Sequence, residues 1–198
     1  MGEPGLQLAS PAVADEKSPA TGRKKRSRAG SPQHWMIVSS PENFRKTREQ
    51  GFTLQGIKSR HRKRAEAMRP GDRILFYVTG QMAFAATCTL ASGMFEDHSH
   101  IWRTSRREED YPWRVRMRPD HLLDDSEWLP AKDLAYRLEY VRKWPPEHWT
   151  LAFQGHVHQL PQKDFKLIED EILRIAGQRR PSDDLAVGGA KRATAASG

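Results

Sequence analysis

The position of the aromatic residues is the feature that most constrains how this chain can fold. All seven Phe, six Trp and four Tyr residues lie between residues 33 and 176. The flanking segments, 1–32 and 177–198, are rich in Pro, Gly, Ser, Ala and charge, and cannot bury enough apolar surface to offset the entropy of ordering. We therefore expect one folded domain over residues 33–176 between two disordered tails, the first of them basic.

The positive charge of the chain is concentrated in these tails. The formal net charge is +8, and the N-terminal tail, with its run GRKKRSR, has six Lys or Arg residues against three acids. The domain itself is only mildly basic. Flexible basic arms attract any polyanion weakly and in a salt-dependent way. The simpler interpretation of the run is a tail that only keeps the protein in solution.

Two further features limit the class of protein. Cys88 is the single cysteine, which excludes a disulfide framework and a cysteine metal site. No apolar run approaches the roughly 18 residues that span a membrane, and the N-terminus lacks the apolar core of a signal peptide. We expect a soluble protein of the cytoplasm that does not bind a membrane.

Apolar periodicity predicts about five or six strands interleaved with short helices. Strand-like patterns occupy residues 34–40, 73–80, 83–92, 111–119 and 150–160, and helix-like patterns occupy residues 41–50, 59–68, 130–138 and a closing segment from Asp164. Gly80-Gln81 predicts a tight hairpin turn. The helices are too short for a doubly wound parallel sheet. We expect an α+β fold, a small mixed β-barrel with short peripheral helices.

Four aromatic residues are candidates for the walls of a binding pocket. In the strand RILFYV, Tyr77 points away from the face formed by Ile74, Phe76 and Val78. Phe52 lies in a connecting segment, and Trp102 and Tyr111 lie in or beside a polar, irregular one. Each ring alone is more often a core residue, but together they could stack on a flat ligand such as a nucleobase, at about 1–3 kcal/mol per stack.

Polar and basic residues complete the candidate interface. Ser39 and Gln55 would supply the hydrogen bonds that fix the identity of a ligand. Lys58, at the start of the basic run near residue 60, is a further candidate ligand contact. Basic side chains that could contact a phosphate backbone lie on the helix near residue 60 and on one strand face: Arg60, Lys63, Arg64, Arg114 and Arg116. A solvated helix face is the simpler alternative for the first group.

Catalytic motifs are missing from the sequence. It has no Gly-rich phosphate loop, no H-E-x-x-H and no G-x-S-x-G. The pairs His98/His100 and His156/His158 could hold a metal on a strand, with Asp97 as a further ligand, but eight histidines produce such pairs by chance. We expect no catalytic residues, no metal and no cofactor.

An ordered series of residues resembles the EVE domain, a member of the PUA-like superfamily that also holds the PUA, ASCH and YTH domains. The matching positions span roughly residues 33–175 and are Trp35, Ser39, Gly51-Phe52, Gln55, Gly56, Lys58, Met68, Pro70-Gly71-Asp72, Tyr77, Tyr111-Pro112, Arg114-Val115, Phe153, Gly155 and Asp164-Phe165. No single position is specific. The order of the whole set carries the resemblance.

The resemblance implies a PUA-like barrel with an aromatic-lined pocket that faces the loops. It places Ser39 and Asn43 beside the pocket as polar contacts, and Phe52 and Tyr77 as its walls. Many EVE domains have a tryptophan where this chain has Phe52, which stacks less strongly. The function implied is a non-enzymatic module that binds RNA or DNA and reads a modified base. The alternatives are a nucleotide-binding or small-molecule enzyme that uses the histidine pairs, and an adaptor whose basic tails do the binding.

Overall fold

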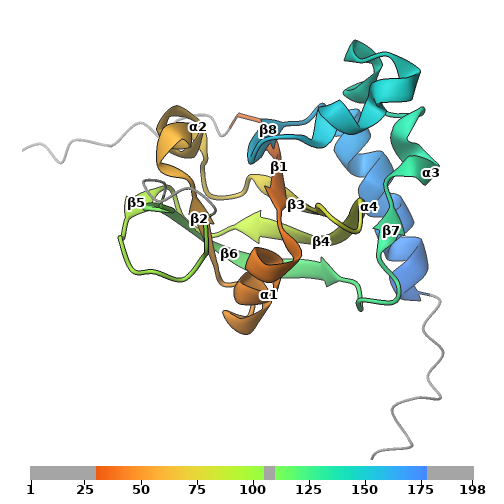
Figure 1. Cartoon of the computed structure of the whole chain (residues 1–198). Helices are drawn as coiled ribbons and strands as arrows, with labels where there is room; N and C mark the ends of the chain where they lie inside the picture. The colour runs from red at the N-terminus through yellow and green to blue at the C-terminus, as the bar shows by residue number, and fades with distance from the viewer. Residues whose placement is uncertain (1–29, 105–109, 178–198) are drawn as a thin grey trace, which may run out of the picture. The chain divides into compact units, whose positions relative to one another are not determined.

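The computed structural model describes residues 30–104 and 110–177 (Figure 1). The predicted tails fall almost wholly outside these residues, so the assignment of residues 1–32 and 177–198 as disordered stays a prediction. Among the described residues, no helix combines the length and the apolar character needed to cross a membrane.

A mixed sheet, curled into a half-barrel, forms the centre of the domain. Its main strands are β1 (His34–Ser39), β2 (Leu54–Ile57), β3 (Arg73–Val78), β4 (Ala83–Leu90), β6 (Trp113–Leu122) and β8 (Val157–Gln159), in the order β2-β6-β4-β3-β1-β8. Two short strands, β5 (Phe95–Glu96) and β7 (Leu129–Pro130), pair with β6 and β4. β1 and β3 are parallel, and the remaining pairs are antiparallel. The predicted α+β class and the predicted β3–β4 hairpin are confirmed.

Short helices surround this sheet. They are α1 (Pro41–Glu49), α2 (Arg62–Ala67), α3 (Lys132–Ala135) and α4 (Gln162–Gly177), with 3-10 turns η1 (Ser59–His61), η2 (Val141–Lys143) and η3 (Pro146–Phe153). Helix α1 begins as predicted, because the Ser40 hydroxyl accepts a hydrogen bond from the backbone N–H of Asn43 at 3.2 Å and Pro41 follows as the first helical residue.

Two predicted segments differ from the structure. Residues 150–153 were expected in a strand but belong to η3, which begins at Pro146, a residue suited to the first turn of a helix. Residues 54–57 were expected in a connection but form β2, where they pair with β6. Both short segments have too few residues for their periodicity to distinguish one element type from another.

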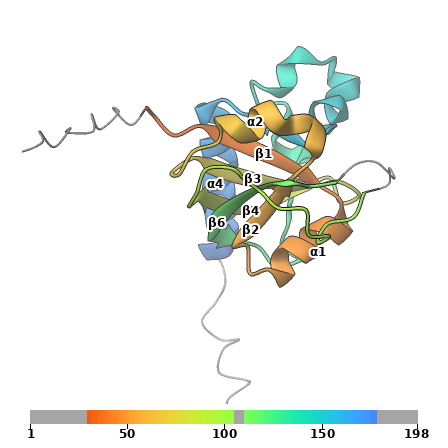
Figure 2. The ribbon, with the colours of Figure 1, turned by 90° about the vertical axis from the view of Figure 1, so that its left-hand side faces the viewer.

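Both faces of the sheet are covered by other elements (Figures 1 and 2). One face of β3, with Ile74 and Phe76, packs in a core shared with α1, α2 and β2. The other face, with Leu75 and Tyr77, packs in a second core shared with α3, η3 and α4. Tyr77 is 3% exposed and its ring stacks on that of Phe153, 4.6 Å away between centroids. The prediction that Tyr77 walls a pocket is therefore wrong, because helices cover the face that was expected to be open.

Candidate functional site

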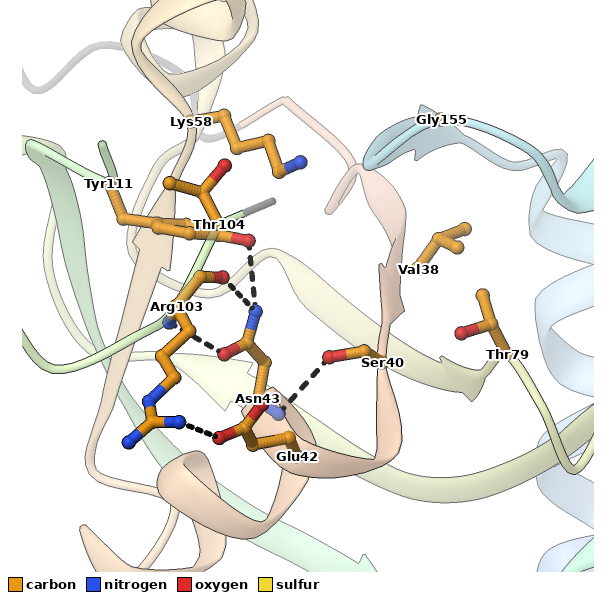
Figure 3. A pocket seen from close by; sticks show the side chains of 10 residues that line it. All are labelled: Val38, Ser40, Glu42, Asn43, Lys58, Thr79, Arg103, Thr104, Tyr111 and Gly155. Carbon is orange, nitrogen blue, oxygen red and sulfur yellow. Dashed lines mark hydrogen bonds and ion pairs between the residues drawn. The ribbon is translucent and has the colours of Figure 1, made fainter. Parts of the chain in front are cut away.

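A pocket of about 430 Å³ lies where β1 runs into α1, next to the loop between β5 and β6 (Figure 3). Three predicted site residues, Asn43, Lys58 and Tyr111, line it. The other lining residues are Val38, Ser40, Glu42, Thr79, Arg103, Thr104 and Gly155. Its volume lies in the range of small-ligand sites, which are about 300–1,000 Å³.

The parallel pairing of β1 and β3 brings the parts of this pocket together. Ser39 pairs with Val78, so the carboxyl ends of the two strands meet at one edge of the sheet. Ser40 and Thr79 follow these ends directly, and Lys58 follows the end of β2. The pocket is thus built on strand ends, which hold the side chains of the following residues in fixed positions.

Asn43 joins α1 to the loop on the far side of the pocket. Its Nδ2 donates to the Arg103 carbonyl at 2.7 Å and to the Tyr111 hydroxyl at 3.0 Å, and its Oδ1 accepts from the Arg103 backbone N–H at 2.8 Å. The Arg103 guanidinium also pairs with the Glu42 carboxylate at 3.0 Å. Asn43 therefore holds the pocket wall in place, in addition to bordering the space.

Tyr111 is the single aromatic side chain among the described residues that line the pocket. The rings of Trp102 and His156 pack against it at 6.1 and 5.4 Å between centroids. The Lys58 ammonium lies 5.6 Å from the centre of the Tyr111 ring. Tyr111 is 6% exposed, so its ring is held from several sides and borders the pocket with only a small part of its surface.

Trp102 and Gln55 lie behind the pocket and do not line it. Trp102 is buried, and its indole N–H donates to the Thr47 hydroxyl at 2.9 Å. Gln55 accepts from the same Thr47 hydroxyl at 3.0 Å and donates to the Gly56 carbonyl at 2.7 Å. These contacts correct the predicted ligand-binding role of both residues, because their polar groups are engaged within the protein.

Phe52 and Ser39 are also placed differently from the prediction. Phe52 is 2% exposed and packs edge-on against Phe44 and Phe76, with centroids 5.5 and 5.8 Å away. Ser39 is buried at the end of β1, and its hydroxyl donates to the Ser40 carbonyl at 3.2 Å. Neither residue lines the pocket. The Phe52 ring lies in the core because it makes more contacts there than it would in an open loop.

The basic residues divide into exposed and buried members. Arg60, Lys63 and Arg116 are exposed, and their role as phosphate contacts stays a prediction. Arg64 is also exposed, but its guanidinium donates to the Val157 carbonyl. The prediction for Arg114 is wrong: the residue is 1% exposed, and its guanidinium contacts the loop after β5.

Burial of Arg114 is matched by contacts to that loop. Its guanidinium donates to the carbonyls of Asp97 and Ser99 and lies 4.5 Å from the centre of the Trp102 ring. Burial lowers the pKa of the guanidinium. Arg114 thus fastens the loop onto β6 and has no surface for a phosphate.

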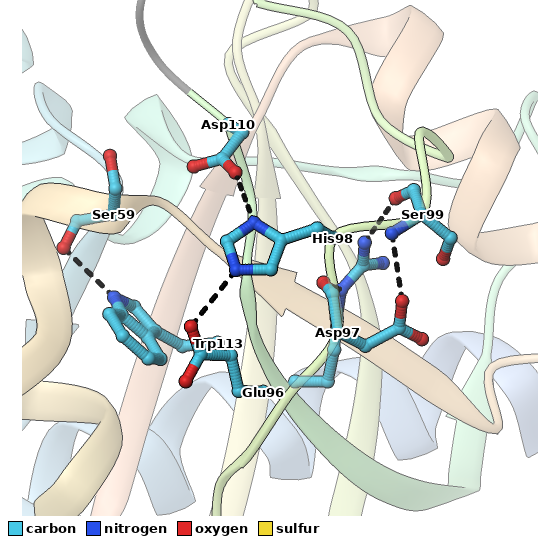
Figure 4. A network of polar contacts seen from close by, with 8 residues as sticks. Ser59, Glu96, Asp97, His98, Ser99, Asp110 and Trp113 are labelled. Carbon is cyan, nitrogen blue, oxygen red and sulfur yellow. Dashed lines mark hydrogen bonds and ion pairs between the residues drawn. The ribbon is translucent and has the colours of Figure 1, made fainter.

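The histidine pairs do not converge on a metal site. His98 lies between Asp110 and Glu96, each 2.9 Å from a ring nitrogen, and these hydrogen bonds raise its pKa (Figure 4). His156 is buried, with Nδ1 3.2 Å from the Val38 carbonyl. Over residues 30–104 and 110–177, no group of three or more His, Cys, Asp or Glu side chains is placed to hold a metal ion.

Burial of His156 predicts a pH dependence of stability. Desolvation lowers the pKa of His156 to about 3, whereas the pKa of the same side chain in the unfolded protein is about 6.5. Between these values the unfolded chain takes up a proton that the folded protein does not, so stability is lost as the pH falls. We expect the free energy of unfolding to decrease by about 1.4 kcal/mol per pH unit below 6.5 from this group alone. Urea unfolding at pH 7, 6 and 5 measures it.

The matched variants for this measurement are His156→Gln and His148→Gln. The first removes the buried imidazole and should flatten the slope between pH 6.5 and 5, while the second changes an exposed histidine and should leave the slope as it is. Equal slopes in all three proteins would contradict the prediction.

Several pocket residues were missed by sequence reasoning. Ser40 carried a helix-capping signal but no binding signal, and Arg103 carried none. Arg103 is held at the pocket by its bonds to Asn43, a residue 60 positions earlier in the chain, and by its ion pair with Glu42. No local pattern reports a contact of that separation.

Comparisons with known proteins agree with this architecture. A family model described as EVE domain matches residues 33–171. A UPF0310 protein of Pyrococcus abyssi is 24% identical over 145 residues, covering 69% of this chain and 96% of the relative. The YTH domain of Mmi1 superposes with a TM-score of 0.55 at 8% identity, covering 74% of this chain and 92% of that one.

A second solved structure shares the fold. It is the YTH domain of Zygosaccharomyces rouxii MRB1, solved in complex with N6-methyladenosine RNA, with a TM-score of 0.51 and 17% identity. The match covers 72% of this chain and 87% of that one.

Proposed function

The chain belongs to the EVE domain family, and on that premise we propose that it is a non-enzymatic nucleic-acid-binding module whose pocket receives a single base, with preference for a modified one. The observation that carries the proposal is the pocket of about 430 Å³, which is bordered by the largely buried Tyr111 and a set of polar side chains. The RNA complex of the yeast YTH domain, a protein of the same fold, supports it.

A base enters such a pocket only after it has left its neighbours in the strand. Flipping a base out of a duplex costs a few kcal/mol, so single strands are favoured. Stacking on Tyr111 would return about 1–3 kcal/mol. A methyl group on the base would gain about 0.8 kcal/mol if it reached an apolar part of the lining, for which Val38 is the aliphatic candidate.

The phosphate backbone would be held outside the pocket by exposed cations. Arg60, Lys63 and Arg64 lie on η1 and α2, immediately after the pocket residue Lys58, and Arg116 is exposed on β6. Contacts of this kind position a strand without reading its sequence, and they weaken as salt rises. Binding of phosphate by these cations alone should be lost at high salt. The part of the affinity that comes from the base in the pocket should remain at the same salt concentration.

The test replaces the ring that would carry the stack. We expect Tyr111→Leu to lower affinity for a single-stranded oligonucleotide about tenfold or more, because one aromatic stack is lost. Affinity for the same strand with an abasic site at its centre should stay unchanged. Fluorescence titration at a fixed salt concentration measures both. Tyr136→Leu is the control, since Tyr136 is 67% exposed, follows α3 directly and does not line the pocket.

A modified-base preference is tested on the same strands. Uracil against thymine, and cytosine against 5-methylcytosine, each differ by one methyl group. Equal binding to both members of every pair, abolished completely by salt, would rule out a reader. A shortened chain without residues 1–32 and 178–198 separates the domain from the tails: loss of all affinity in that chain would favour the adaptor alternative.

A further inference from the structure

His98 lies between two carboxylates, beside the loop that joins β5 to β6 (Figure 4). Its Nδ1 is 2.9 Å from Oδ2 of Asp110, and its Nε2 is 2.9 Å from Oε1 of Glu96. A neutral imidazole has a single N–H and can donate to only one of these oxygens, so the other would face a nitrogen lone pair. Both contacts are hydrogen bonds only when the ring carries a proton on each nitrogen.

The charges around His98 favour this protonated form. Three carboxylates lie near it on β5 and on the loop, and they belong to Glu96, Asp97 and Asp110. From β6, the buried Arg114 guanidinium donates to the Asp97 carbonyl at 3.1 Å. On α2, the charge of Arg62 is paired with Glu66 at 2.8 Å. The hydrogen bonds to Glu96 and Asp110 raise the pKa of His98, so the ring holds its proton to a higher pH than an ordinary histidine.

The contact with Asp110 connects the sheet to the pocket wall. Glu96 is held in β5, which pairs with β6. Asp110 belongs to no strand and directly precedes Tyr111, and its carbonyl accepts the Ser59 backbone N–H at 3.1 Å. His98 therefore ties the carboxylate beside Tyr111 to a residue that the sheet holds in place.

Both ends of the loop border the pocket, and Asn43 joins them. Arg103 lies on the first end and Tyr111 on the second. The Asn43 side-chain amide donates to the Arg103 carbonyl at 2.7 Å and to the Tyr111 hydroxyl at 3.0 Å. A movement of Asp110 that carries Tyr111 with it must therefore change a hydrogen bond of this amide. The Asn43 amide thus reports on the position of the pocket wall.

We propose that His98, while both its ring nitrogens are protonated, is a positioning residue that holds Asp110 and, through it, the Tyr111 side of the pocket wall in the form that receives a ligand. The effect on ligand affinity rests on the function proposed above, whereas the effect on the pocket wall does not. When the ring loses a proton, one of its two carboxylate contacts is lost and Asp110 can move.

The sign of the pH dependence follows from the direction of the pKa shift. Because the pKa of His98 is raised, its contribution is present at low pH and disappears as the pH rises through that pKa. This direction is opposite to the one expected from His156, whose effect on stability appears as the pH falls.

The first experiment follows the full chain by NMR without nucleic acid, from about pH 5 to about pH 9. We expect the His98 ring protons and the Asn43 side-chain amide protons to shift with the same midpoint, above the ordinary histidine pKa of about 6.5. Glu96→Gln should lower both midpoints, because it removes one of the two carboxylates that favour the proton. Glu96 does not line the pocket, so this substitution acts on the pocket wall through His98.

Three further variants identify the residue that titrates. His98→Gln should leave the Asn43 signal without a pH-dependent shift. His98→Arg should keep that signal at its low-pH position throughout, because it keeps a charge and N–H donors for both carboxylates. His100→Gln, a change at an exposed histidine two residues away, should leave both midpoints as they are. An Asn43 signal that does not titrate with His98, or that keeps its midpoint in Glu96→Gln, would overturn the proposal.

The second experiment measures affinity at the two ends of this pH range. Fluorescence anisotropy at constant salt compares a single-stranded oligonucleotide with the same strand that has an abasic site at its centre. We expect the base-dependent part of the affinity to fall about threefold at high pH, since exposed ion pairs have modest effects, and to stay constant in His98→Arg. Other histidines should change the binding of both strands alike, because their charge acts on the phosphates.

The outcomes separate this inference from the function on which it rests. Equal binding of the two strands at every pH, with the Asn43 signal still following His98, would overturn the base-binding function and leave the positioning role standing. A base-dependent affinity that is the same at both ends of the pH range, in a protein whose His98 loses its proton between them, would overturn the effect of His98 on binding and leave the function standing.

Discussion

Replacing Gly56 with alanine is expected to destabilise the domain and to remove base-dependent binding together. A Cβ at this position would lie 2.5 Å from Cε3 of Trp102, 2.6 Å from its Cζ3 and 2.9 Å from Cβ of Tyr111. The Trp102 ring and the Tyr111 side chain at its Cβ must both move, and such overpacking costs about 1–3 kcal/mol. Because Tyr111 is the stacking wall in the proposed function, the same movement would displace the surface on which the base would lie.

The position of Gly56 within β2 prevents an easy escape from this clash. It pairs with Arg114 on β6, so the backbone is held by the sheet. Trp102 is held in turn by its bond to Thr47 and by the Arg114 guanidinium over its ring. The strain should therefore reach Tyr111 instead of being absorbed nearby.

Urea unfolding and oligonucleotide titration of Gly56→Ala measure the two effects. Gly93→Ala is the matched control, because a Cβ there meets its nearest neighbour, the Met68 carbonyl, at 3.9 Å. We expect this control to keep both stability and affinity. A Gly56→Ala protein that loses stability but binds base-bearing strands normally would mean that Tyr111 is not part of the binding surface.

The parts of the fold that the sequence predicted are those with local signals. Each of these signals lies within a short stretch of sequence: the Ser40-Pro41 start of α1, the hairpin turn at Gly80-Gln81 and the apolar spacing of α4. The order of strands is different, because the β1–β3 pairing joins residues about 40 positions apart. The resemblance implied a PUA-like barrel but no order of strands, so the β1–β3 pairing was not predicted.

The candidate site was predicted only in part, for a physical reason that Tyr77 illustrates. Alternation along a strand separates its two faces but does not say what covers each of them. The second core, formed with α3, η3 and α4, lies 50 or more residues later in the chain and takes the face expected to be open. Asn43, Lys58 and Tyr111 lie at the pocket, whereas Phe52, Gln55 and Trp102 support it from within.

The second large effect is expected for Asp72, which joins β1 to the turn before β3. Its carboxylate is buried and accepts three hydrogen bonds, from the backbone N–H of Gln33 at 2.9 Å, the indole N–H of Trp35 at 3.0 Å and the backbone N–H of Arg69 at 3.1 Å. Asp72→Ala leaves these donors without a partner, each at about 1–3 kcal/mol if no water reaches it. We expect a total loss of roughly 3–5 kcal/mol, near the upper limit for one substitution.

Chemical unfolding measures this loss, with Asp125→Ala as the control. Asp125 also forms a close ion pair, at 2.7 Å with Arg48, but on the surface, where such a pair contributes about 0–1 kcal/mol. A similar loss of unfolding free energy in the two variants would show that burial is not the reason why the Asp72 hydrogen bonds stabilise the protein. Asp72 lies directly before β3, and the pocket residue Thr79 lies directly after it. The six residues of β3 separate the two by roughly 20 Å. The folded fraction of Asp72→Ala should therefore keep its affinity for base-bearing strands, since the contacts that it loses lie at the end of the strand away from the pocket.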